Sequence, residues 1–227
     1  MSTIWPTGLH SIGGALVRCH LLVWERSAVL IDTGLCLAPY RLRKLMSRLA
    51  LKPTALRAIL LTHGHLDHTG GLAEIKAWSG APVFAHPAEQ AHIDGTFSYH
   101  GAARVGGAIE AMGRTLLGYH PVKIDTPVRD GDELPFWGGL RVVHLPGHTA
   151  GHCGFFSARE NVLFSGDLFA SYAFSAHLSP AIFTSQPALL PASVARVRAL
   201  NPAGLVPNHY DRPDTALHLR RFDQVTC

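Results

Sequence analysis

A dense group of metal-binding residue types lies in the first third of the chain. Residues 63–68 read HGHLDH, so three histidines and one aspartate fall within six positions. Imidazole nitrogens and carboxylate oxygens are ligands that suit zinc, and they also bind iron and manganese. The apolar segment at 56–62 predicts a strand that ends directly at His63. A turn there can direct the first two histidines to one metal ion, and Asp67 and His68 to a neighbouring one.

Three more candidate ligands each follow a predicted strand. His148 lies in the glycine-rich segment LPGHTAGH, Asp167 lies in SGD, and His209 lies in VPNH. Loops at strand ends on one edge of a sandwich can converge on a shared site. We therefore interpret these residues and the HGHLDH turn as one metal site. For the turn alone, the alternative is a solvated, histidine-rich loop that binds no metal.

The elements that must position these residues alternate between short strands and helices. Apolar segments predict strands at 16–24, 28–31, 56–62, 82–85, 140–145, 152–157, 161–165 and 205–206. Helices are predicted at 40–51, 69–79, 87–93, 103–117 and 188–200, and from 213 onward. This order, without repeats or linkers, predicts one domain of mixed strands and helices over 1–227.

In order and type, these motifs resemble those of the metallo-β-lactamase superfamily, and the resemblance covers nearly the whole chain. It also includes the segment IDTG at 31–34, which ends the second predicted strand. The resemblance implies an α/β fold, a four-layer αβ/βα sandwich of the metallo-β-lactamase type. In that fold two β-sheets pack face to face between helices, and a dinuclear metal site lies at one edge.

The resemblance also implies a role for each candidate residue. Three residues resemble the ligands of a first metal ion: His63, His65 and His148. Three resemble the ligands of a second: Asp67, His68 and His209. Asp167 resembles the carboxylate that bridges both ions, and Asp32 resembles an aspartate that holds the metal-binding turn by hydrogen bonds. The cofactors expected are two divalent metal ions, zinc first, with iron or manganese as alternatives.

Three features of this sequence indicate which branch of the family it resembles. Asn208 precedes His209 where the glyoxalase-type motif has glycine, which makes His209 the least secure ligand. An aspartate at the bridging position, Asp167, argues against the antibiotic-destroying branch. Only 18 residues follow His209. Hydroxyacylglutathione hydrolases carry a long helical extension there, so a lactonase-like, esterase or thioesterase arrangement is expected instead.

The chemistry implied is metal-dependent hydrolysis. Two divalent ions that share a hydroxide lower the pKa of bound water toward neutrality, and Asp67 is expected to orient that hydroxide. We predict hydrolysis of an ester, thioester or lactone bond of a small molecule. The alternatives are a persulfide dioxygenase with a single iron, a β-lactam or phosphodiester hydrolase, and a non-enzymatic diiron redox protein.

Substrate choice is expected to depend on the segment 86–127, which is rich in glycine, alanine and histidine and is predicted to be an insertion. We expect it to form a lid whose apolar side chains line a pocket: Phe97, Tyr99, Met112, Leu116, Leu117 and Tyr119. A second wall is expected from residues after the bridging aspartate: Phe169, Tyr172, Phe174 and Phe183. The alternative is that these side chains pack the insertion onto the domain or form a homodimer contact.

Composition narrows the remaining classes. The chain has 227 residues, of which 47% are hydrophobic and 16% charged, which is typical of a compact domain. Its apolar runs are shorter than the roughly 20 residues that cross a bilayer, and its start does not resemble a secretory signal. The formal charge of +4 comes without a long basic run, so neither nucleic acid nor a membrane is an expected partner. Scattered cysteines fit reduced thiols, and we expect a cytoplasmic protein with a small-molecule substrate.

Overall fold

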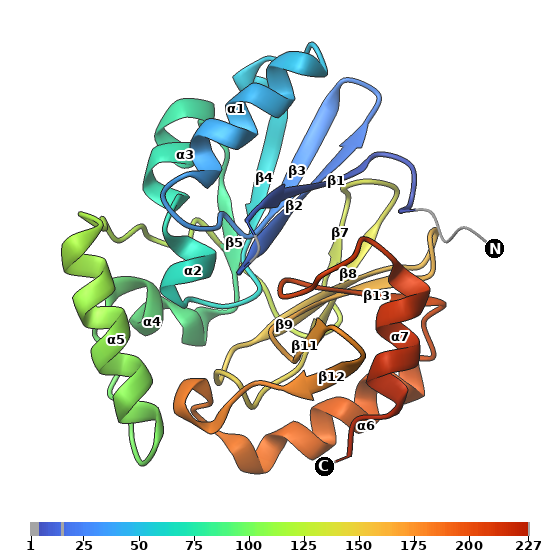
Figure 1. Cartoon of the computed structure of the whole chain (residues 1–227). Helices are drawn as coiled ribbons and strands as arrows, with labels where there is room; N and C mark the ends of the chain where they lie inside the picture. Colours follow the sequence, from blue (N-terminus) through green and yellow to red (C-terminus); the bar gives the residue numbers. More distant parts are fainter. Residues whose placement is uncertain (1–4, 15, 227) are drawn as a thin grey trace.

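Two β-sheets lie between helices in the computed structural model, which describes residues 5–14 and 16–226 (Figure 1). The first sheet has six strands in chain order: β1 (Leu9–Gly13), β2 (Arg18–Trp24), β3 (Ser27–Ile31), β4 (Leu56–Leu60), β5 (Val83–Ala85) and β6 (Thr126–Pro127). The second has five, in the order β13 (Gly204–Pro207), β10 (Val162–Gly166), β9 (Cys153–Ser157), β8 (Leu140–His144) and β7 (Glu133–Leu134). A separate hairpin pairs β11 (Phe169–Tyr172) with β12 (Ser175–Leu178).

Strand direction brings several strand ends to one edge of the sandwich. Strands β1, β2 and β3 pair antiparallel, whereas β3, β4, β5 and β6 pair parallel. In the second sheet β10 and β13 are parallel, and β7, β8, β9 and β10 are antiparallel. Parallel neighbours end at the same edge, so the loops that follow β3 and β4, and those that follow β10 and β13, are adjacent.

The two-residue alternation along the strands produces separate apolar layers. On β3, Val29 and Ile31 pack in the cluster between the two sheets, whereas Leu30 packs in the cluster under the helices. On β10, Phe164 faces the first sheet and Leu163 faces the opposite side. Both sheets are therefore apolar on both faces, and each needs a layer of helices.

Helices supply those two outer layers. Helices α1 (Ala38–Arg48) and α3 (Leu72–Ser79) cover the first sheet, with Leu42 and Ile75 in the shared cluster (Figure 1). Helices α6 (Leu190–Leu200) and α7 (Thr215–Asp223) cover the second, with Val194 and Phe222 in theirs. The predicted four-layer α/β sandwich is confirmed. Within the described part of the chain, no helix has both the length and the apolar character that a membrane crossing requires.

The segment 86–127, called the insertion segment below, follows β5 and ends with β6. It contains α4 (Gln90–Asp94) and α5 (Ala103–Leu116), and α5 lies at the outer side of the molecule (Figure 1). A short helix, α2 (Leu66–Thr69), precedes α3, where a single helix over 69–79 was predicted. The prediction also missed β1, β6, β7 and the β11–β12 hairpin, because these strands are short and contain no continuous apolar run: LHSIG, TP, EL, FASY and SAHL.

Candidate metal centre

The candidate ligands lie in loops at one edge of the sandwich. The HGHLDH turn follows β4 and runs into α2, and His148 lies between β8 and β9. Asp167 follows β10, and His209 lies just beyond β13. Gly166 pairs with Pro207 across these two parallel strands, which brings Asp167 and His209 to the same place.

The first group of donors comprises His63, His65 and His148, whose ligand atoms all lie within 4.8 Å of one another. The Nε2 atoms of His63 and His148 are 3.0 Å apart. All three side chains are buried, and burial lowers the pKa of each. These imidazoles are therefore neutral at neutral pH, which is the form that binds a metal ion.

The second group comprises four donors: Asp67, His68, Asp167 and His209. His209 Nε2 is 3.0 Å from Asp167 Oδ2, and His68 Nε2 is 3.3 Å from Asp167 Oδ1. The Oδ2 atom of Asp67 lies 3.5 Å from His209 Nε2. Asp167 Oδ2 is also 3.8 Å from Nε2 of His148 in the first group, so this carboxylate lies between the two groups.

The second group carries charge where the first does not. Burial alone lowers the pKa of His68 and His209, but the carboxylate of Asp167 and then that of Asp67 outweigh it. The pKa of His68 lies well above its ordinary value, and that of His209 rises to about 10. In turn the two histidines hold the pKa of Asp167 well below its ordinary value, against the effect of burial.

The donor set fits divalent transition metals. His68 Nε2 and Asp167 Oδ1 are buried and face each other at 3.3 Å at the centre of the second group, and neither has a further hydrogen-bond partner among the described residues. Buried polar atoms of this kind are costly unless something binds them. Imidazole nitrogens with a few carboxylate oxygens suit zinc, iron or manganese better than calcium or magnesium.

Asp32 anchors the metal-binding turn from below. This buried residue adopts a left-handed conformation (φ 56°) directly after β3. Its carboxylate accepts hydrogen bonds of 2.8 Å from both the backbone N–H and the hydroxyl of Thr62, and lies 3.0 Å from His68 Nδ1. A carboxylate at Nδ1 holds a proton there, so Nε2 of His68 is the atom that faces the site and would bind a metal ion once it loses its own proton.

Asn208, which precedes His209, joins this network. Its Nδ2 donates to Asp32 Oδ2 at 2.8 Å and to the carbonyl of Arg18 at 2.7 Å. The next residue, His209, has its Nδ1 2.5 Å from the carbonyl of Leu16 and its Nε2 toward Asp167. The side chain of Asn208 therefore holds the start of the loop that carries His209.

Two buried polar residues near the site carried no sequence-based assignment. The backbone N–H of Asp167 donates to His152 Nε2 at 3.0 Å, and His152 Nδ1 lies 3.0 Å from the carbonyl of Leu145. Burial lowers the pKa of His152 to about 4, so it is a neutral acceptor that fixes Asp167. The position of His152 at the end of the LPGHTAGH segment was the sequence signal that could have identified it. The sequence carries no such signal for Glu89, because its hydrogen-bond partners lie far away in the chain.

Glu89 ties two metal-site loops together. Its buried carboxylate accepts from the backbone N–H of Gly64 at 2.7 Å and from that of Gly151 at 2.8 Å. Gly64 lies between His63 and His65, and Gly151 lies in the loop that carries His148. Burial raises the pKa of Glu89 to about 7, although the two backbone donors oppose that rise.

A cavity of about 440 Å³ opens over the candidate ligands. Its floor contains members of both donor groups: His65, Asp67, His148, Asp167 and His209. Its walls are mainly apolar: Leu35, Leu66, Ile109, Phe169, Pro180 and Phe183. No lysine or arginine of the described chain lines it.

None of the six side chains expected to line a pocket from the lid lines this cavity, and the role of the segment as a lid stays a prediction. The six are Phe97, Tyr99, Met112, Leu116, Leu117 and Tyr119. Helix α5 instead turns Ile109, Glu110 and Gly113 to the cavity, and its last apolar side chains are exposed. The cavity agrees better with the second predicted wall, which comprises residues after Asp167.

Three of the four residues expected in that wall line the cavity: Phe169, Tyr172 and Phe183. Phe174 is 93% exposed, at the turn of the β11–β12 hairpin, and does not line it.

Comparison with known proteins identifies the family. Residues 12–209 match the model of the metallo-β-lactamase superfamily, so the chain belongs to this superfamily. The chain is 28% identical over 169 residues to the probable metallo-hydrolase YflN of Bacillus subtilis, covering 68% of this chain and 64% of YflN. It is 28% identical over 156 residues to the hydroxyacylglutathione hydrolase GloC of Haemophilus influenzae, covering 65% and 64%. The matched regions thus span less than two-thirds of either relative.

A solved structure supports the same conclusion. The di-iron-bound form of TTHA1623 superimposes with a TM-score of 0.70 at 27% identity, covering 94% of this chain and 97% of that one. The predicted membership of the metallo-β-lactamase superfamily is confirmed.

Proposed function

We propose that this protein is a dinuclear-metal hydrolase that cleaves an ester, thioester or lactone bond of a small neutral molecule with an apolar acyl part. The observation that carries the proposal is the position of Asp167. Its carboxylate lies between two groups of donors on the floor of an apolar cavity. A single carboxylate in contact with both groups fits a pair of ions better than one ion.

The residues divide between two ions and their bridge. The first ion is assigned His63, His65 and His148, and the second Asp67, His68 and His209, with Asp167 between them. Zinc is the first choice, and iron is the alternative that the di-iron form of TTHA1623 supports. Divalent ions bound here supply Lewis-acid activation of water and of a carbonyl oxygen near neutral pH.

Asp67 is the proposed catalytic side chain. Its carboxylate is partly exposed and lines the cavity, whereas His68 beside it is buried. Burial raises the pKa of Asp67, but His68 and then His209 bring it below its ordinary value. Asp67 is therefore ionised at neutral pH and can accept a hydrogen bond from the attacking water, which orients that water toward a substrate carbonyl.

The cavity wall favours a neutral substrate. Phosphodiesters and peptidic carboxylates are usually matched by lysine or arginine side chains, and none lines this cavity in the described chain. Apolar walls from α5 and from the segment after β10 suit an acyl chain. A glutathione thioester is the second candidate, because GloC is named a hydroxyacylglutathione hydrolase.

Metal analysis and a substrate panel test the proposal. Protein purified without chelator is expected to contain about two ions per chain, and to hydrolyse medium-chain lactones or aryl esters faster than a phosphodiester or a β-lactam. Asp167→Asn provides the control, since it keeps the side-chain size but removes the carboxylate charge. A single iron per chain, or preference for the phosphodiester, would overturn the proposal. Preference for S-lactoylglutathione over neutral esters would favour the second candidate. The cytoplasmic location and the homodimer contact stay predictions.

A further inference from the structure

The insertion segment contacts the HGHLDH turn, called the metal-binding turn, at Gly64. Gly64 separates His63 from His65, and both of its backbone polar groups bond to the insertion segment. Its N–H donates to Glu89 at 2.7 Å, and its carbonyl accepts from the guanidinium of Arg114 at 3.2 Å. These bonds leave little freedom for the peptide that joins the two histidines.

A third hydrogen bond to the backbone fixes the turn just after His65. The N–H of Leu66, the first residue of α2, donates to Glu110 Oε1 at 2.6 Å. The other oxygen of Glu110 accepts from the hydroxyl of Tyr99, also at 2.6 Å. Glu110 is therefore held by its own segment while it holds the residue that follows His65.

Packing at Gly64 is as close as the hydrogen bonding. A Cβ atom built on Gly64 would lie 2.6 Å from the Cβ of His92 and 3.0 Å from the backbone N of Ile93. The insertion segment thus lies directly against the backbone of the turn, and a side chain at position 64 would force the two apart.

Arg114 is itself firmly placed. Besides Gly64, its guanidinium donates to the carbonyls of His92 at 2.8 Å and Ile93 at 3.3 Å. It also stacks over the ring of Tyr119, 4.3 Å from the ring centroid. Arg114 does not line the cavity. Its contacts are directed to the backbone of α4 and of the metal-binding turn, a placement suited to bracing.

We propose that the insertion segment is a brace for the metal-binding turn, with Arg114 and Glu110 as positioning residues for His63 and His65. The inference rests on the proposed metal role of these two histidines. This bracing role is separate from the predicted lid, because it depends on bonds to the backbone of the turn, whereas Ile109 and Gly113 of the same segment line the cavity. Side chains that orient metal ligands typically change metal affinity by about 10- to 100-fold when removed.

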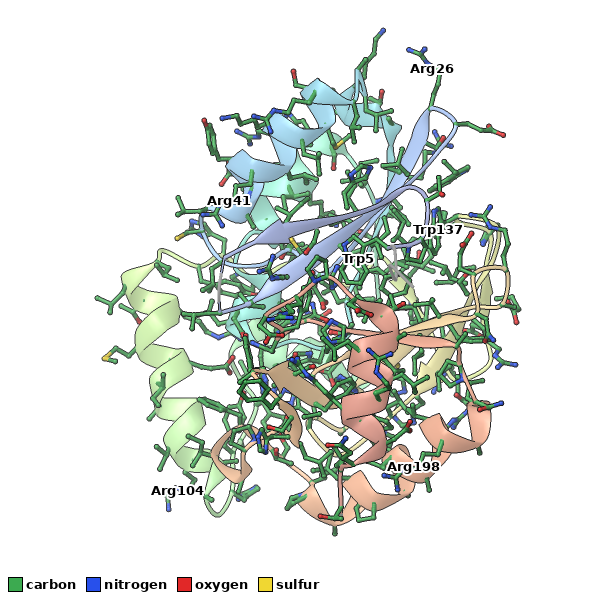
Figure 2. The ribbon with its side chains drawn as sticks, turned by 45° about the vertical axis from the view of Figure 1, so that its right-hand side comes forward. Trp5, Arg26, Arg41, Arg104, Trp137 and Arg198 are labelled. Atoms are coloured by element: carbon green, nitrogen blue, oxygen red, sulfur yellow. The ribbon has the colours of Figure 1, made fainter. Side chains whose placement is uncertain are left out.

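The first test measures backbone exchange in metal-free protein. Hydrogen exchange of the Gly64 and Leu66 amides is expected to be at least about tenfold faster in Arg114→Ala and Glu110→Ala than in the wild type. Arg104→Ala is the matched control. Arg104 is exposed at the N-terminal end of the same helix (Figure 2). Among the described residues, its side chain makes no hydrogen bond to the turn. Unchanged exchange in the first two variants would overturn the brace.

The second test measures metal affinity by competition with a chelator, using Zn²⁺ as the probe. Arg114→Ala and Glu110→Ala are expected to weaken binding at the first group about 10- to 100-fold, while Arg104→Ala does not. Glu110→Gln keeps an acceptor for the Leu66 N–H and is expected to restore most of the affinity. Arg114→Lys should recover less, because an ammonium cannot serve three carbonyls in a fixed fork.

The two tests separate this inference from the proposed function. If wild-type protein binds neither Zn²⁺ nor Fe²⁺, the proposed function fails while the exchange measurement still reports on the brace. If Zn²⁺ binds as tightly to the four variants of Arg114 and Glu110 as to the wild type, the proposed brace is wrong and the metal site stands. The conservative variants, Glu110→Gln and Arg114→Lys, keep the tests decisive if an alanine variant does not fold.

Discussion

Asn208 Nδ2 donates a hydrogen bond of 2.8 Å to Oδ2 of Asp32, across 176 positions of sequence. Through this bond the loop after β13 is joined to the loop after β3, on opposite sheets. The carboxylate of Asp32 also accepts a hydrogen bond from the backbone N–H of Thr62, just before the HGHLDH turn, and lies 3.0 Å from Nδ1 of His68 within that turn. One buried carboxylate therefore sets the relative position of loops that carry ligands from both sheets.

Removing this bond is expected to cost stability and metal affinity together. Asn208→Ala leaves one donor fewer at Asp32 and an unpaired Arg18 carbonyl, so the free energy of unfolding should fall by about 1–3 kcal/mol. Chemical denaturation measures this. Gln224→Ala, at an exposed amide, is the control and should change stability by less than about 0.5 kcal/mol. Equal effects of the two changes would show that the Asn208 amide contributes nothing specific.

The bridge is tested by comparing two ligand variants. Asp167→Ala is expected to reduce binding of both ions, because its carboxylate contacts both donor groups. His209→Ala should mainly weaken one ion, since His209 belongs only to the second group. Metal titration with elemental analysis gives the stoichiometry of each variant. Similar partial losses in both would mean that Asp167 does not bridge.

The charge state of the second group predicts a pH dependence of metal binding. In the metal-free protein the pKa of His68 lies well above its ordinary value and that of His209 is about 10, so both are protonated at pH 7. A metal ion must displace these protons, whereas the neutral histidines of the first group release none. Binding at the second group should therefore tighten as pH rises from 6 to 8, with proton release near two per ion. Calorimetry in buffers of different ionisation enthalpy counts those protons.

A buried histidine outside the site predicts acid sensitivity of the fold. Burial lowers the pKa of His20 to about 3, while its Nε2 lies 3.2 Å from the carbonyl of Pro207. The unfolded chain takes up a proton near pH 6.5 and the folded chain does not, so stability is lost as pH falls from about 6.5 toward 3. The loss attributable to His20 is about 1.4 kcal/mol per pH unit. Unfolding of metal-free protein should show a shallower decline for His20→Gln; parallel curves would contradict this.

Much of the site was predictable because ligands occur at strand ends in a fixed order. The HGHLDH turn and His148 follow apolar segments that form buried strands, and short loops leave them few other positions. Asp167 and His209 also follow predicted strands, which related them to the same edge, and the superfamily resemblance then implied a role for each. The roles of Glu89 and Arg114 could not be predicted, because each acts through backbone groups that only tertiary packing brings near.

The insertion segment shows the same limit. A helical period identifies which side chains share a face of α5, but it does not say which face meets the domain. Met112 and Leu116 are apolar and yet 60% and 76% exposed, whereas the polar Glu110 faces the cavity. On α5, apolar composition therefore selected side chains that do not line the cavity, while the role of the segment as a lid stays a prediction.

The correct face of α5 gives the last prediction, which concerns substrate length. Ile109 lines the cavity and Leu116, on the same helix, does not. If an acyl chain packs against Ile109, Ile109→Ala should lower kcat/KM for long-chain esters or lactones roughly tenfold and leave short-chain substrates nearly unchanged, because each buried methylene contributes about 0.8 kcal/mol. Leu116→Ala is the matched control and should affect neither. Kinetics over a series of chain lengths, with metal content checked in each variant, decide the matter. If Ile109→Ala lowers the rates of long and short substrates by one common factor, the α5 wall does not bind the chain, and the side formed by Phe169 and Phe183 becomes the place to look.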